Sequence, residues 1–330
     1  MMRSIAAIRL FWLWSTSTVV ALSSSGAVDR RSIVQGAGVA AAFSFFRPEP
    51  SFAADTSLVV PKNKAVVVLG ANGKTGRECV KALLNDGRPC IATTRTGDFV
   101  YEGSTTAGLT IAQADVTSLE SLSQVITKDV GAVIFAASTS AKGGNSAAVD
   151  RDGVLNTAEA CIAADVQRLV VVSSGGVSRP DSAIYKLLNF AVKGVMEAKI
   201  QGEDGMREMY AAPSVLEKKL GYTVIRPGGL LLEDPVGASR LELNQGDSKS
   251  GRLPRVDVAS LCVQCLSSAS AWDATFECYE AVTAKPIESV GLSNILRSTD
   301  ATTFTSGKER RGNSWEELFN GLERDPGHVI

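Results

Sequence analysis

Three glycines that follow a short apolar run constrain the fold of this chain more than any other feature of its sequence. Residues 65–69 have the length and composition of a buried parallel strand, and Gly70, Gly73 and Gly76 come directly after them. Helical periodicity then runs over residues 75–84. Glycines allow a tight turn and a close approach to a pyrophosphate, and the free N–H groups of the helix N-terminus favour an anion. The pattern predicts a dinucleotide-phosphate loop that contains Gly70, Asn72, Gly73, Lys74, Thr75 and Gly76.

Further strands and helices alternate along the rest of the chain. The alternation predicts an α/β fold with a doubly wound parallel sheet of the Rossmann type. Ala136, which ends the fourth strand, is assigned to the cofactor site. Helices are expected over residues 117–126 (with Thr117 as the N-cap), 149–164 and 256–266. The further strands are expected over residues 90–94, 109–113, 132–136, 168–173, 222–226 and 275–279.

Composition divides the chain into three parts around a single domain. Residues 1–54 contain two apolar stretches, each preceded by arginine, and are expected to be a targeting leader that is removed. Residues 55–283 are expected to form the NAD(P)-binding domain, in which residues from about 230 to 254 are irregular enough to act as a substrate lid. Residues 284–330 are expected to form a small C-terminal extension with one short helix, capped by Ser314 and Glu317.

The tandem signals of the leader resemble the multipartite leaders of plastid proteins. The second signal carries the pair Arg30-Arg31, as a twin-arginine signal for the thylakoid lumen does. The sequence therefore predicts a plastid (chloroplast) protein, either in the thylakoid lumen or, alternatively, in the stroma. Neither apolar stretch reaches the roughly 18 continuous residues of a spanning helix, so no transmembrane helix is expected in the mature chain. Association with the thylakoid is left open.

The end of the second strand predicts which dinucleotide is bound. An acidic residue there binds the ribose diol of NAD, whereas a cation accommodates the 2′-phosphate of NADP. This chain has Arg95 at that position and no acid before Asp98. We therefore expect NADP, with NADPH preferred over NADH; a solvated Arg95 is the alternative. Asp115 and Val116, after the third strand, are expected to contact the adenine, with helix capping as an equal alternative for Asp115.

Charge and composition exclude several classes of function. With 34 Lys and Arg against 35 Asp and Glu, the formal charge is −1, which argues against a nucleic-acid partner. The single histidine, His328, makes a histidine base or a multi-histidine metal site untenable. Cys262 and Cys265 lie on an apolar helical face and are expected to pack in the core, so no metal site is predicted.

Several motifs in the order found here resemble the atypical short-chain dehydrogenase/reductases of the NAD(P)-binding, NmrA-like kind. The resemblance runs from about Lys64 to Ala281. It implies that Ser173 or Ser174 faces the nicotinamide and that Pro227 and Gly228 pass the far side of the same pocket. The motifs are residues 68–76, 114–116, 149–153, 171–175, 223–228 and 255–259.

The chain departs from that family at the family's catalytic pair, Tyr-x-x-x-Lys. Lys199 lies where the lysine of atypical members is found, but Val195 stands four residues before it. The resemblance implies that Lys199 holds the nicotinamide ribose, with a solvated helix lysine as the alternative. Tyr185, from the preceding loop, is the candidate proton donor, and an ordinary packed tyrosine is the alternative.

Two functions compete on these grounds. The first is an NADP-dependent reductase that acts on a small apolar plastid metabolite. The second is a catalytically weak NADP-binding scaffold or redox sensor that assists the assembly of a photosynthetic complex. Loss of the tyrosine favours the second, and retention of Lys199 with the serine pair favours the first.

Overall fold

The computed structural model describes residues 56–140, 144–290 and 304–327. The predicted leader, residues 1–54, lies outside the described residues, and so does His328. Within the described ranges, no helix is both long and apolar enough to cross a membrane.

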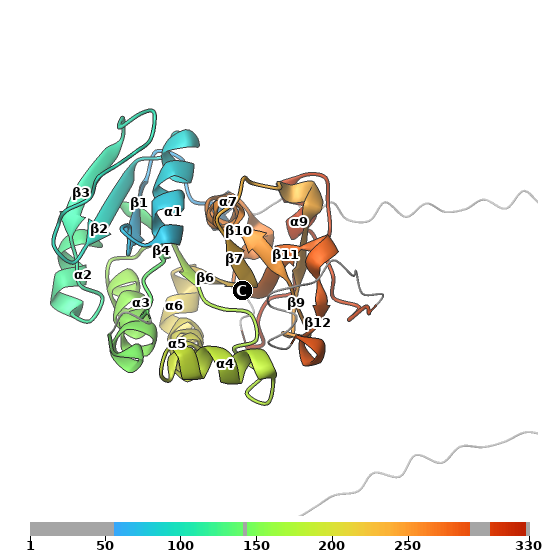
Figure 1. The fold of residues 1–330 in the computed structure, drawn as a ribbon. Helices are drawn as coiled ribbons and strands as arrows, with labels where there is room; N and C mark the ends of the chain where they lie inside the picture. The colour runs from blue at the N-terminus through green and yellow to red at the C-terminus, as the bar shows by residue number, and fades with distance from the viewer. Residues whose placement is uncertain (1–55, 141–143, 291–303, 328–330) are drawn as a thin grey trace, which may run out of the picture. The chain divides into compact units, whose positions relative to one another are not determined.

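An eight-stranded sheet forms the centre of the domain (Figure 1). Its strand order is β3-β2-β1-β4-β5-β6-β11-β8, and every neighbouring pair is parallel except β11 with β8. This confirms the predicted doubly wound α/β fold. The order reverses between β1 and β4, which is where ligands bind in open sheets of this kind. The strands are β1 (Ala65–Leu69), β2 (Cys90–Thr94), β3 (Leu109–Gln113), β4 (Val130–Phe135), β5 (Arg168–Val172), β6 (Gly221–Pro227), β8 (Leu241–Asn244) and β11 (Ala274–Glu280).

Helices cover both faces of the sheet, because successive strand residues point to opposite sides. Val66 and Val68 pack in one apolar cluster with α1 and α7, whereas Val67 and Leu69 pack in another with α2, α3 and α5. Both thiols of Cys262 and Cys265 are buried in the first cluster, as predicted. The helices are α1 (Lys74–Asn85), α2 (Leu119–Val125), α3 (Gly153–Ala163), α4 (Ala183–Ala191), α5 (Val195–Tyr210), α6 (Pro213–Glu217), α7 (Arg255–Cys265) and α9 (Trp315–Phe319).

Three local expectations were wrong. Ser118, rather than Thr117, caps α2, because its side chain accepts a hydrogen bond from the Ser121 N–H. The helix expected from residue 149 begins as a π-helical segment, η2 (Ala147–Asp152), and becomes α-helical only at Gly153. Tyr185 is not in a loop but lies in α4, which the sequence reasoning missed together with the start of α5.

The segment expected to act as a lid is ordered into short strands over part of its length. Strand β8 is buried and joins the central sheet beside β11. Two short pairs of strands lie outside the central sheet. They are β7 (Gly229–Leu231) with β10 (Arg252–Pro254), which run parallel, and β9 (Lys249–Ser250) with β12 (Lys285–Pro286), which run antiparallel.

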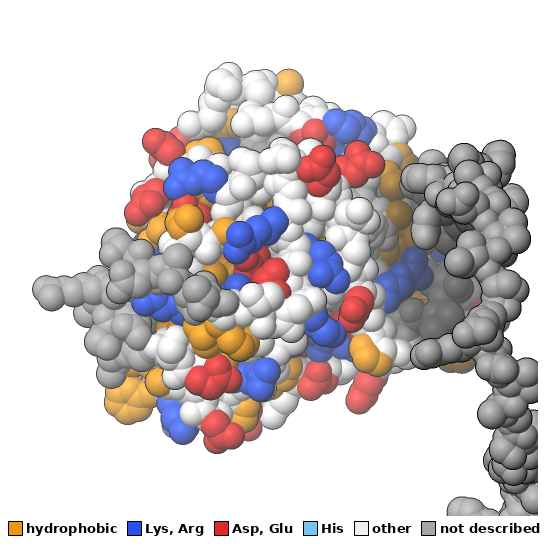
Figure 2. All heavy atoms as spheres, turned by 90° about the vertical axis from the view of Figure 1, so that its right-hand side faces the viewer, with side chains coloured by type: hydrophobic (Ala, Val, Ile, Leu, Met, Phe, Trp, Pro, Cys, Tyr) orange, Lys and Arg blue, Asp and Glu red, His pale blue; other side chains and the backbone are white. Residues whose placement is uncertain are grey.

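The C-terminal helix docks on the domain as predicted. Ser314 caps α9 by accepting a hydrogen bond from the Glu317 N–H, and Leu318 and Phe319 are buried. The Phe319 ring lies 6.0 Å from that of Phe276 on β11. On the face shown in Figure 2, basic and acidic side chains are interspersed rather than gathered by sign.

Candidate functional site

The glycine loop joins β1 to α1 at the point where the strand order reverses. Gly70 has a φ of +81°, and a Cβ there would lie 2.8 Å from the Ala137 backbone, so the turn presses against the end of β4. A Cβ on Gly76 would lie 2.2 Å from the Gly70 carbonyl oxygen, so this glycine lets α1 pack against the turn. Gly73 is exposed, and a Cβ there would meet only the Gly70 carbonyl oxygen, at 3.1 Å, and the Ala136 carbonyl oxygen, at 3.9 Å.

This loop fits a dinucleotide pyrophosphate. Gly73 is the N-cap residue of α1 and supplies no side-chain cap, so the first N–H groups of the helix are not closed off by a side chain. Such N–H groups, with the positive end of the helix dipole, bind anions. Ala136, after β4, donates its N–H to the Leu69 carbonyl at 3.0 Å and so lies beside the loop, as expected. Lys74 is exposed on the first turn of the helix.

Arg77, which the sequence reasoning did not single out, braces the loop. Its guanidinium donates to the Val100 carbonyl at 2.8 Å and to Asn72 Oδ1 at 3.1 Å, and it lies over the Phe99 ring. Asn72 in turn donates to the Asp98 carbonyl at 2.8 Å. The side chain of Asn72 therefore fixes the glycine loop to the segment after β2. The signal that could have found Arg77 is its place directly after the third glycine.

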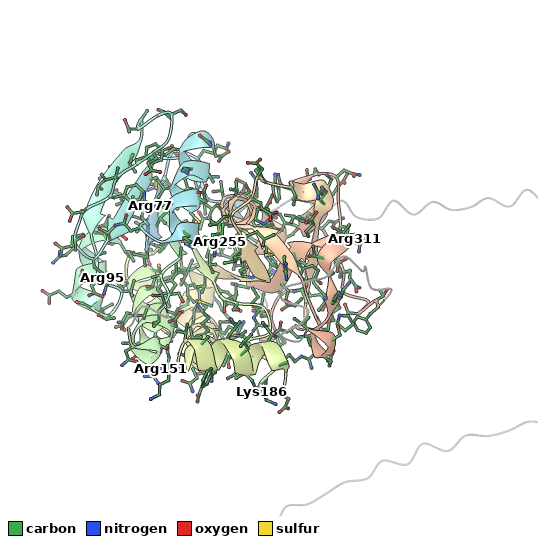
Figure 3. All side chains as sticks on the ribbon, in the orientation of Figure 1. Arg77, Arg95, Arg151, Lys186, Arg255 and Arg311 are labelled. Atoms are coloured by element: carbon green, nitrogen blue, oxygen red, sulfur yellow. The ribbon has the colours of Figure 1, made fainter. Side chains whose placement is uncertain are left out.

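Arg95 lies directly after β2, exposed at the same edge of the sheet as the glycine loop (Figure 3). No hydrogen bond or ion pair of its guanidinium is present within the described residues. Asp115 Oδ1 accepts from the N–H and the hydroxyl of Thr117, at 2.9 Å and 2.8 Å, so one carboxylate oxygen serves a local turn. Val116 is buried and packs in the same apolar cluster as Val154 of α3.

Lys199 makes an ion pair with a buried carboxylate that the sequence reasoning did not assign. Its Nζ lies 2.8 Å from Asp150 Oδ1, and the Asp150 side chain is fully buried. Asp150 also accepts from the Ser138 hydroxyl at 2.6 Å and from the Thr139 N–H at 2.9 Å. Burial opposes the ionisation of Asp150, but Lys199 and these donors outweigh it and lower its pKa. The pair therefore joins α5 to the loop after β4, at the switch point.

The two serines after β5 point to different surroundings. Ser174 lines a cavity, whereas Ser173 is buried and its hydroxyl makes no hydrogen bond within the described residues. Tyr185 does not line that cavity; it packs with Val177, Val195 and Met196. Burial, with a smaller effect of Glu197, raises the pKa of Tyr185.

The cavity has a volume of about 350 Å³ and opens at the carboxyl ends of β5 and β6. Ser174 and Gly175 follow β5, and Pro227 and Gly228 close β6. The backbone holds these ends together, because the Gly175 N–H donates to the Pro227 carbonyl at 2.8 Å. The remaining lining residues belong to α4, β7, β9, β10 and β12, to the first residue of α7 and to nearby loops. They are Ile184, Leu187, Leu188, Gly229, Leu230, Ser250, Gly251, Arg252, Arg255, Thr283, Lys285 and Val290.

A buried ion network is centred on Arg226, the chain neighbour of the cavity-lining residue Pro227. Arg226 donates to Glu203 at 2.7 Å and lies 3.5 Å from Glu277 Oε1. Burial opposes the charge on Glu203, but Arg226 and Arg207 hold its pKa at about 2. Burial and then the Asp247 carboxylate raise the pKa of Glu277 to about 8. The Asp247 carboxylate accepts from the N–H groups of Gly176 and Ser178, so this network also fixes the segment after Ser174 and Gly175.

Two chloroplastic proteins are similar in sequence to this chain. An uncharacterized chloroplastic protein of Arabidopsis thaliana is 31% identical over 240 residues, which cover 68% of this chain and 82% of that protein. A 95-residue segment is 38% identical to the chloroplastic protein High Chlorophyll Fluorescence Phenotype 173 of the same plant, and covers 28% of this chain and 14% of that protein.

Solved structures share the fold at low sequence identity. An oxidoreductase from Lactococcus lactis has a TM-score of 0.54 at 18% identity, over 72% of this chain and 99% of that one. A short-chain dehydrogenase/reductase from Veillonella parvula, solved in complex with NADP, has a TM-score of 0.52 at 18% identity, over 67% of this chain and 96% of that one. A family model described as NAD(P)H-binding matches residues 70–269, from the glycine loop to beyond α7. Because that match spans more than half of the chain, the protein belongs to the NAD(P)H-binding family.

Proposed function

We propose that the protein is an NADPH-dependent reductase of the NmrA-like short-chain dehydrogenase/reductase type that acts on a small metabolite in the plastid. The observation that carries the proposal is the position of the cavity. It opens at the carboxyl ends of β5 and β6, on the same edge of the parallel sheet as the glycine loop after β1. In doubly wound sheets, cofactor and substrate meet along this edge.

Different residues of the chain would bind the cofactor, border the substrate and position the loop after β4. The glycine loop and the N-terminus of α1 would hold the pyrophosphate, and Arg95 would bind the 2′-phosphate. Bound NADPH supplies the hydride. Ser174, Pro227 and Gly228 border the substrate. Lys199 and Asp150 act as positioning residues, since they fix the loop after β4 through Ser138. We assign the proton to water, because Tyr185 lies outside the cavity lining and its pKa is raised.

The plastid assignment is supported by the two chloroplastic relatives and by the tandem signals in the first 54 residues. Determination of the mature N-terminus in isolated organelles tests it: cleavage close to Asp55 is expected, and an intact leader would contradict it.

Arg95→Glu tests the cofactor assignment. The unmodified protein should bind NADPH more tightly than NADH, as measured by fluorescence titration. Loss of one charge-assisted hydrogen bond of about 1.5–3 kcal/mol, with added repulsion, should weaken NADPH binding by about 10- to 100-fold and leave NADH binding unchanged. Lys128→Glu is the matched control, since Lys128 is exposed at the opposite edge of the sheet, just before β4. Equal affinities of the unmodified protein for the two dinucleotides would contradict the assignment.

A second function has its own supporting observation. Val195 occupies the position of the family tyrosine and is buried, so this side chain offers no proton donor. That favours an NADPH-binding scaffold or redox sensor in the assembly of a photosynthetic complex, the alternative from the sequence. NADPH oxidation with a panel of quinones and isoprenoid carbonyls separates the two. Turnover supports the reductase, and tight NADPH binding without turnover of any of them supports the scaffold.

A further inference from the structure

The residues that line the cavity are of two chemical kinds. The apolar lining consists of Ile184, Leu187 and Leu188 of α4 together with Leu230 of β7. The cationic lining consists of Arg252, Arg255 and Lys285, and no aspartate or glutamate is among the described residues that line the cavity. Pockets for small molecules are mostly apolar, and their few polar groups set the orientation and chemical class of the ligand.

Most of the apolar lining comes from α4, whose hydrophobic side chains are only partly buried. None of the residues of α4 is fully buried, although its sequence is Ala-Ile-Tyr-Lys-Leu-Leu-Asn-Phe-Ala. Ile184, Leu187 and Leu188 are half-buried on the cavity side, and Phe190 is 89% exposed. An apolar ligand in the cavity would remove the first three from water, which is favourable in proportion to the area covered.

Within the cationic lining, the Arg255 side chain is held in place. Its Nη1 donates to the carbonyls of Leu230 and Leu231, at 3.2 Å and 3.3 Å. Its Nε is buried and has no hydrogen-bond partner in the described part of the chain. The nearby carboxylate of Asp257 does not neutralise it, because Asp257 accepts instead from the N–H groups of Val236 and Gly237, at 2.8 Å and 2.9 Å.

Lys285 adds a second positive charge to the lining. It lies in β12, half-buried, and makes no ion pair within the described residues. Arg252 lies at the start of β10, and its backbone N–H donates to the Thr283 hydroxyl at 2.8 Å. Arg255 and Lys285 thus bring two positive charges to one cavity, and no carboxylate is among its described lining residues. An anion between the two cations would relieve their mutual repulsion.

We propose that the substrate of this cavity has an apolar body and an anionic end, either a carboxylate or a phosphate. The apolar body lies against α4 and Leu230, and the anionic end lies between Arg252, Arg255 and Lys285. The inference rests on the proposed function, because it names the substrate class of the same cavity. The anionic end would not use the residues proposed for the cofactor phosphates, since the glycine loop and Arg95 lie at β1 and β2 and line no part of this cavity.

The test uses three probes of one chain length on the full-length protein in the presence of NADPH. Octanoate, octyl phosphate and octanol differ only in the end group, and their affinities are measured by calorimetry. We expect both anionic probes to bind at least about tenfold more tightly than octanol. The tighter of the two identifies the anionic group. Equal binding of all three would overturn the proposal.

Variants locate the two ends of the ligand. The double variant Arg252→Gln/Lys285→Gln should weaken both anionic probes by about 100-fold or more and leave octanol unchanged. Leu187→Ser should weaken all three probes. Lys186→Gln is the matched control, since Lys186 lies on the same helix, is exposed, and does not line the cavity (Figure 3). An effect of Lys186→Gln as large as that of the double variant would show a general charge effect and overturn the proposal.

NADPH affinity, titrated separately, keeps the two hypotheses distinguishable. If NADPH binds but the probes do not discriminate by charge, the substrate class is wrong and the proposed cofactor function stands. If the anionic probes bind selectively and NADPH does not bind, the substrate class stands and the proposed reductase function fails.

Discussion

At the scale of single residues, the most consequential contact is the ion pair of Lys199 with Asp150. The Asp150 carboxylate is buried and satisfied by Lys199, Ser138 and the Thr139 N–H. Removing one partner of a buried pair leaves an uncompensated charge, which costs more than the pair contributes. The pair therefore stabilises the loop after β4 whether or not Lys199 also reaches the ribose of the cofactor.

Lys199→Met should lower the free energy of unfolding by about 3 kcal/mol at neutral pH, because it leaves the Asp150 carboxylate buried without its cation. Asp150→Asn/Lys199→Met should recover part of this loss. Urea denaturation measures both. Lys193→Met is the control, since Lys193 is exposed and makes no ion pair in the described ranges. An unchanged midpoint for Lys199→Met would contradict a structural role.

Acidification gives an independent check on the same pair. The pKa of Asp150 is lowered in the folded protein, so its contribution is present at neutral pH and is lost as the pH falls through the folded-state value. The unmodified protein should therefore lose more stability on acidification than the double variant.

At the scale of elements, the glycine loop shows how two glycines in one motif serve different purposes. Gly76 is required by packing, because its α-carbon faces the Gly70 carbonyl at the base of α1. Gly73 is exposed and has room on its outer side, which leaves the helix N-terminus accessible to a phosphate.

Gly76→Ala and Gly73→Val should therefore fail in different ways. In Gly76→Ala the new Cβ would lie 2.2 Å from the Gly70 carbonyl oxygen, so α1 must shift, and we expect a loss of about 1–3 kcal/mol in unfolding free energy. Gly73→Val should keep the circular dichroism spectrum and most of the stability but abolish NADPH binding. Undiminished NADPH binding by Gly73→Val would place the cofactor elsewhere.

At the scale of the whole molecule, Arg226 connects parts of the chain that are far apart in sequence. From β6 it reaches Glu203 on α5, Glu277 on β11 and, at 4.0 Å, Asp247 after β8. The four side chains are buried, and three of them are acidic. Their pKa values are consequently driven apart, to about 2 for Glu203 and about 8 for Glu277.

Glu277→Gln should change the pH dependence of stability. Its folded-state pKa of about 8 exceeds the unfolded value of about 4.3, so the folded protein keeps a proton that the unfolded chain releases between these values. The stability contribution of Glu277 is therefore complete below about pH 4.3 and is lost as the pH rises to about 8. Relative to the unmodified protein, Glu277→Gln should gain stability as the pH rises from about 4.3 to about 8, with a slope of at most about 1.4 kcal/mol per pH unit.

Glu203→Gln is the matched control for this experiment. The pKa of Glu203 is about 2, so it stays ionised throughout that window, and its replacement should destabilise the protein by a similar amount at each pH. A parallel pH dependence of Glu277→Gln and the unmodified protein would contradict the raised pKa.

The sequence by itself determined the parallel sheet, the glycine loop and the C-terminal helix. These depend on local information: apolar runs of strand length, glycines at fixed spacing, and the Ser314–Glu317 cap. Each is decided by neighbours within a few residues, so a single chain suffices to find it. The match to the NAD(P)H-binding family begins at the first of these glycines, Gly70, directly after β1.

Only the tertiary structure decided which side chains meet at the cavity and in the core. Tyr185 lies outside the cavity because α4 turns Ile184, Leu187 and Leu188 toward it. Part of the segment expected to act as a lid forms β8, which completes hydrogen bonds that the edge of β11 would otherwise lack. Pairs such as Asp150 with Lys199 and Arg226 with Glu277 join segments distant in sequence. Their geometry follows from how the helices pack on the twisted sheet, and no local pattern of residues encodes that packing.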